Sequence, residues 1–169
     1  NNTFVGSGAG QGGTTSAPFS SGQYNTALGY QALTGFTTGH SNAVVGNQAG
    51  YNISSGHELT IMGYQAGYNV TTADNNIIMG YQAGYNLTSA RYNVLIGDQA
   101  GYSLTTTSGN NENVFIGNAA GMFADASTVD ARYNVYVGSG AGRYIDDGHS
   151  SVIIGKEAGK SNSAGGNAT

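Results

Sequence analysis

One short unit repeats along the whole chain and limits what the chain can fold into. Nine copies of the pattern N-x-h-h-G-x-x-A-G, where h is apolar, run through the sequence, some with a single departure. Their spacings, measured between the central glycines, are 23, 17, 17, 17, 17, 20, 21 and 17 residues, so the basic period is 17. A period this short holds a strand and its turns, but not a pair of helices. The nine anchoring glycines are Gly6, Gly29, Gly46, Gly63, Gly80, Gly97, Gly117, Gly138 and Gly155.

Each unit is predicted to be one coil of an all-β, parallel β-solenoid. Its three-residue apolar run is rich in Val, Ile, Leu and Phe, which favour strands, and it closes on a glycine suited to a turn. Nine coils stacked at about 4.8 Å would make a rod on the order of 40 Å long. Residues 1–169 form a single repetitive segment, which we expect to be part of a longer fibrous chain. The additional residues fall between coils, in loops 11–23, 103–111 and 124–132.

The composition excludes several classes of protein. The 29 glycines lack a Gly-X-Y period, which excludes collagen. The net charge is −4 and only five Lys and Arg are present, too few and too scattered for a nucleic-acid surface. Without cysteine there are no disulfides or thiolate metal sites, and no apolar run is long enough to span a bilayer. We expect no cofactor, no nucleic-acid partner and no membrane insertion of this segment.

The first and third residues of each strand are expected to face the inside of the coil, opposite a column of alanines. Every copy has alanine three residues after the anchor glycine, which implies a thin interior. The residue just before the glycine is always large and apolar, from Val5 to Ile154, and it shares a face with the residue two positions earlier. We assign this pair of columns to the interior. Asparagine recurs four positions before the glycine and is expected to form a hydrogen-bonded ladder along the rod.

The middle residue of each strand is then expected to point outward. A strand that is apolar on both faces is normally covered on both, and a large exposed apolar stripe marks an interface. The sequence therefore predicts that copies of the chain associate through this stripe. The predicted oligomer interface consists of Phe4, Val44, Ile61, Ile78, Leu95, Phe115, Tyr136 and Ile153.

The repeats resemble those of a known group of surface proteins. NNTFVGSGAG and SSVIIGKEAG are similar to the N-S-V-A-I-G repeats of trimeric autotransporter adhesin heads. NTALGYQAL and IMGYQAGYN resemble the N-T-A-x-G-x-Q-A-L repeats of bacterial and phage tail-fibre-like proteins. The resemblance implies a left-handed parallel β-roll, a homotrimer, and display on a cell or virion surface. The chain differs from the adhesin pattern in its longer period and in the bulky middle residue of its strands.

Two rows of side chains are candidates for contact with sugars. Tyr51, Tyr68, Tyr85 and Tyr102 directly follow the Ala-Gly corner in consecutive coils. Such a row can stack on sugar rings, or on itself to shield the backbone. The sequons at Asn52, Asn69 and Asn86 lie in equivalent corners 17 residues apart, so attached glycans would form a stripe.

No catalytic or metal-binding pattern is found. His40, His57 and His149 lie in variable corners, without spacing typical of a metal site and without an expected match between consecutive coils. Asp146 and Asp147 suit a solvated turn. We therefore expect a structural, fibre-forming or adhesive extracellular segment that is not an enzyme, with itself as partner. Two alternatives are a tail-fibre segment that binds a receptor or a glycan, and a hydrolase fused to a solenoid.

Overall fold

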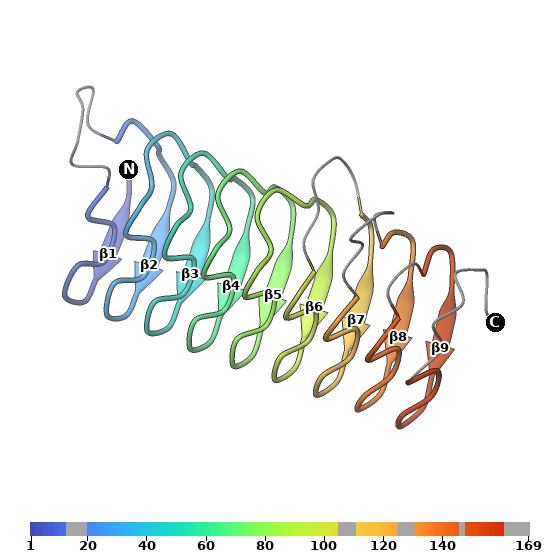
Figure 1. Cartoon of the computed structure of the whole chain (residues 1–169). Coiled ribbons are helices and arrows are strands. Elements are labelled where there is room, and N and C mark those ends of the chain that lie inside the picture. Colours follow the sequence, from blue (N-terminus) through green and yellow to red (C-terminus); the bar gives the residue numbers. More distant parts are fainter. Residues whose placement is uncertain (13–19, 105–110, 125–130, 146–147, 161–169) are drawn as a thin grey trace.

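The fold is a parallel β-solenoid with one short strand in each coil, as the sequence predicts (Figure 1). The computed structural model describes residues 1–12, 20–104, 111–124, 131–145 and 148–160. Within these ranges there are nine strands and no helix, and the strands pair in sequence order in a single sheet. The strands are β1 (Thr3–Val5), β2 (Thr26–Leu28), β3 (Ala43–Val45), β4 (Thr60–Met62), β5 (Ile77–Met79), β6 (Val94–Ile96), β7 (Val114–Ile116), β8 (Val135–Val137) and β9 (Val152–Ile154).

The anchor glycines form the corner at which the strands end, one above another. Gly63 illustrates the column: its N–H donates to Val45 O of the preceding coil at 2.9 Å, and its φ is +137°. A Cβ at this position would lie 2.3 Å from Gly80 O of the next coil. Both the backbone conformation and the spacing between coils therefore require glycine. The anchor glycines therefore line up along the rod, one in each coil, as the predicted stacking of the repeat units requires.

The assignment of the two strand faces is wrong and must be reversed. The middle residue of each strand points into the coil, whereas the residues on either side of it point outward. Side chains alternate between the two faces along a strand. Assigning one position to the wrong face therefore assigns every side chain of the strand to the wrong face. The predicted interface residues are core residues: Phe4 is partly buried at the first coil, and the others are buried, namely Val44, Ile61, Ile78, Leu95, Phe115, Tyr136 and Ile153.

Three columns make up most of the core, and only one of them, the alanine column, was expected to lie there. The middle strand residues and the alanines three positions after the anchor glycine belong to one buried cluster. The third column, seven positions after the glycine, closes the coil from the opposite side. Its buried members are Phe36, Ile53, Val70, Leu87, Leu104, Ala124 and Ile145.

The predicted asparagine ladder is confirmed and lies inside the rod. Asn76 is 1% exposed, and its Oδ1 accepts hydrogen bonds from the backbone N–H and the Nδ2 of Asn93, at 2.8 and 3.0 Å. Asn76 Nδ2 donates to Asp74 O and Ala90 O. Each such side chain therefore satisfies backbone groups of its own coil and of the next one. Leu59 interrupts the ladder, and its N–H donates to Asn42 Oδ1.

Replacing one buried asparagine should destabilise the rod strongly. In Asn76→Ala, Ala90 O and the N–H of Asn93 lose their partners in the interior, which should lower the free energy of unfolding by about 3 kcal/mol. The control is Asn69→Ala, because the Asn69 side chain bonds to the partly exposed side chains of Asn52 and Asn86, and water can replace those bonds. This control should lose less than about 1 kcal/mol. Chemical denaturation measures both, and equal losses would contradict the assignment.

A buried tyrosine gives the rod a predicted sensitivity to alkali. Tyr136 stacks on Phe115 in the core, and among the described residues its hydroxyl has no hydrogen-bond partner. Burial raises the pKa of Tyr136 from 10.0 to about 12. Above pH 10 the unfolded chain therefore loses this proton while the folded chain keeps it, so stability falls as the pH rises from 10 towards 12. Tyr136→Phe should be at least as stable as the parent and lose less stability in this range. The exposed Tyr133→Phe should behave like the parent, and identical profiles for all three would refute the prediction.

Candidate functional site

The row formed by Tyr51, Tyr68, Tyr85 and Tyr102 is a continuous aromatic stack. Neighbouring ring centroids are 5.0 to 5.2 Å apart, and the rings are within 9° of parallel. Both faces of Tyr68 and Tyr85 are thus covered by neighbouring tyrosines. A sugar ring stacks on an aromatic face, so only the edges of these inner rings are open to a ligand. The geometry favours the structural role of this row over the glycan-contact role.

The three sequon asparagines stand side by side next to the tyrosine stack. Asn52 Nδ2 donates to Asn69 Oδ1, and Asn69 Nδ2 donates to Asn86 Oδ1, both at 3.2 Å. All three side chains are partly exposed. An N-linked sugar replaces only one of the two amide hydrogens, so the remaining N–H could still serve the ladder. Glycosylation of Asn52, Asn69 and Asn86 stays a prediction.

A glutamine ladder, which the sequence analysis missed, lies two positions after the anchor glycine. Gln48 Nε2 donates to Gln31 Oε1 at 3.0 Å, and the same bond repeats in each coil up to Gln99. These glutamines have φ between 50° and 54°. Their recurrence at a 17-residue interval was visible in the sequence and would have predicted the ladder.

His40 and His57, which were not expected to match, are stacked in consecutive coils. Their ring centroids are 4.7 Å apart, because the two residues are separated by one full period. The column continues with Asp74 and Arg91. His57 Nδ1 lies 2.8 Å from Asp74 Oδ1, and Arg91 Nε lies 3.0 Å from Asp74 Oδ2. The Asp74 carboxylate is nearly buried and ties the coil above it to the coil below it.

This polar column does not form a hydrolytic triad. Ser41 Oγ lies 3.3 Å from Nδ1 of His40, whereas the carboxylate of Asp74 contacts His57. A triad needs the nucleophile and the acid on the two nitrogens of one imidazole, and here they belong to different rings. In the part of the chain that the structure describes, no three His, Asp or Glu side chains gather as metal ligands. Asp146 and Asp147 lie outside the described residues.

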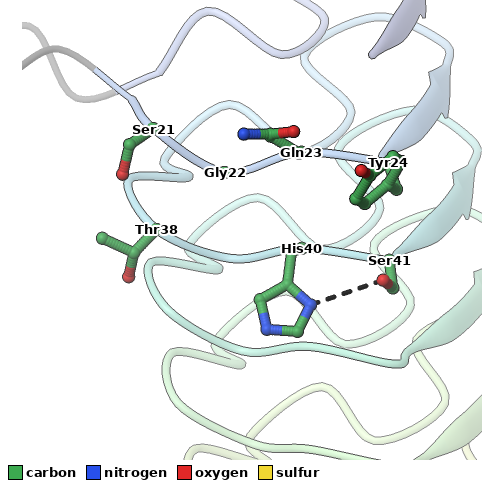
Figure 2. A pocket seen from close by; sticks show the side chains of 7 residues that line it. All are labelled: Ser21, Gly22, Gln23, Tyr24, Thr38, His40 and Ser41. Atoms are coloured by element: carbon green, nitrogen blue, oxygen red, sulfur yellow. Dashed lines mark hydrogen bonds between the residues drawn. The ribbon is translucent and has the colours of Figure 1, made fainter. Parts of the chain in front are cut away.

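A surface pocket lies beside the first of these histidines, between two neighbouring coils (Figure 2). Its volume is about 430 Å³, and its lining carries no carboxylate and no Lys or Arg. The Tyr24 ring, 64% exposed, stands at one end of the pocket, and His40 and Ser41 lie below it. The lining residues are Ser21, Gly22, Gln23, Tyr24, Thr38, His40 and Ser41. An exposed aromatic ring with neutral amide, imidazole and hydroxyl groups suits an uncharged polar ligand.

In the alternative of a tail-fibre segment, the binding site would lie either in the tyrosine rows or in the loops between coils. Most of loops 11–23, 103–111 and 124–132 lies outside the described residues. The described end of the first loop, Ser21 to Gln23, does contribute to the pocket lining.

Comparison of the chain with protein-family models, with curated proteins and with solved structures found no match. No helix in the described ranges is long and apolar enough to cross a membrane.

Proposed function

We propose that the chain is a structural segment of an extracellular fibre or adhesin-like surface protein, and that it acts without catalysis. The observation that carries the proposal is the unbroken stacking of nine coils in register. Each coil contributes its strand, the asparagine of the ladder or a residue in its place, and its anchor glycine. A rod whose coils are equivalent transmits force and sets a distance, whereas an enzyme needs one unique constellation of side chains.

The resemblance to adhesin heads and tail fibres supports the extracellular part of this proposal. It also supports self-association, with a homotrimer as the implied state and end-to-end fibres as its extension. The residues first assigned to the interface are now core residues. Self-association must therefore use another surface of the rod.

Deleting one full period should leave a folded but shorter rod. Removal of residues 64–80 joins Gly63 to Tyr81, the residue that follows the next anchor glycine, so every column stays in register. Repeat proteins tolerate such changes because each unit contacts only its neighbours. Small-angle scattering should show the long dimension reduced by about 4.8 Å. The control deletion, residues 67–80, removes less than a full period and should unfold the following coils. An in-register deletion that unfolds the whole chain would refute the proposal.

A second candidate function is binding of a neutral glycan at the pocket beside Tyr24. Its supporting observation is the lining itself, in which an exposed ring adjoins uncharged hydrogen-bonding groups. On a glycan array, any binding should be lost in Tyr24→Ala, because the sugar would lose its stacking platform. Tyr92→Ala is the matched control, since Tyr92 occupies the same position in another coil, is 47% exposed and does not line the pocket. Equal binding by the parent and both variants would contradict this function.

A further inference from the structure

The outward face of the sheet is apolar along its whole length. The two columns that flank the buried middle residues contain only Thr, Ala, Val, Leu, Ile and Met in all nine coils. We call this surface the outer sheet face. Val5, Met62 and Ile154 are 54%, 45% and 69% exposed, although water would favour polar side chains there. No described segment of the chain covers these side chains.

Tyrosines border this apolar surface at both corners of the coil. On one margin, directly after the anchor glycine, lie Tyr30, Tyr64 and Tyr81. On the other, directly before the buried asparagine, lie Tyr24, Tyr92 and Tyr133. All six are at least 45% exposed. With the single exception of Tyr144, every large hydrophobic that is exposed in the described ranges lies on the outer sheet face or its two margins. Such a concentration on one side of a rod marks a docking surface.

We infer that the outer sheet face is where copies of this chain dock on one another. The inference deepens the proposed structural function and rests on it. The centre of the face is apolar and free of charge, and its margins hold the tyrosines together with a larger number of Ser, Asn and charged residues. An apolar centre with a polar rim is the composition of a protein–protein interface. The few charges on the margins are Glu58, Glu112, Asp98 and Lys156.

The size of the face agrees with this assignment. Nine strands about 4.8 Å apart and four columns about 6.7 Å apart define a surface of roughly 40 Å by 20 Å. This corresponds to about 800 Å² for each partner, the area that a stable interface of standard size needs.

The regular spacing favours a second copy over an unrelated partner. The side chains of the face stand in rows about 4.8 Å apart, one row for each coil. A second copy presents rows at the same interval, so the side chains of two facing sheets can interdigitate over the full length, as in packed sheets about 10 Å apart. A partner without this period would match the face over only a few coils.

The inference is tested with charges on the outer sheet face of the full chain. Met62→Lys/Ile77→Lys places two charges at exposed positions in adjacent coils, where the side chains have room to turn outward. The control Ser55→Lys/Thr72→Lys adds the same charge to two adjacent coils at partly exposed and exposed positions elsewhere on the rod. Sedimentation velocity gives the mass of each variant, and circular dichroism shows whether it is folded.

The parent and the control should sediment as the same oligomer at micromolar concentration. The Met62→Lys/Ile77→Lys variant should stay folded and associate at least tenfold more weakly. A monomeric parent, or a folded face variant with unchanged mass, would overturn the inference. Membrane or polymer binding by a monomeric parent would likewise overturn it in favour of another occupant. If the parent is a monomer and its small-angle scattering still fits a rod, the docking inference fails but the proposed structural function stands. Failure of the inference is thus distinguishable from failure of the proposed function. If the face variant unfolds, Met62→Thr/Ile77→Thr replaces it, because threonine already occupies this face at Thr60.

Discussion

The close approach of successive anchor glycines is the constraint on which the rest of the structure depends. At most of these corners, from Gly6 to Gly138, a methyl group would lie 2.2 to 2.5 Å from the carbonyl oxygen of the next glycine. The same glycines have φ between 128° and 138°, a region that residues with a side chain rarely adopt. Once the corner is fixed in this way, the strands that precede it are held in register. In every other column, equivalent residues of successive coils then become neighbours. The short repeat thereby produces continuous columns of hydrogen-bonded or stacked side chains along the rod.

The period and the corner could be predicted from the sequence, whereas the inside and the outside of the strand could not be separated by hydrophobicity. Phe, Ile and Leu occupy the middle position, but Val, Ile and Met flank it, so an apolar pattern fits either face. The asparagine column held the missing information. Asn76 lies two positions before Ile78, and residues two apart share a face. An asparagine that serves the backbone inside the coil therefore places Ile78 inside as well, as the structure shows.

Other features went unpredicted because they depend on which residues the coil brings together. The third core column has no fixed residue type: Phe36, Val70 and Ile145 share it. The position seven residues after the glycine can be assigned to the core only when the path of the chain around the coil is known. The stacking of His40 on His57 was missed for a simpler reason, since their separation of one period already places them in the same column. The pocket beside Tyr24 arises from the shape of the surface between two coils, which no repeat pattern contains.

Stacking of like on like also explains why so few residues are charged. In a solenoid each side chain has the equivalent residue of the next coil as its neighbour, about 4.8 Å away. Two like charges at that distance repel by about 1 kcal/mol in water and by about 4 kcal/mol near a protein surface, and the penalty would recur in every coil. Neutral amides and tyrosines avoid it, because they hydrogen-bond or stack with their own kind. The Asp74 carboxylate, in turn, has groups of another kind as its column neighbours: it contacts the imidazole of His57 on one side and the guanidinium of Arg91 on the other. The charged content of 8% is thus a consequence of the repeat geometry, and the same geometry leaves the outer sheet face uncharged along its centre.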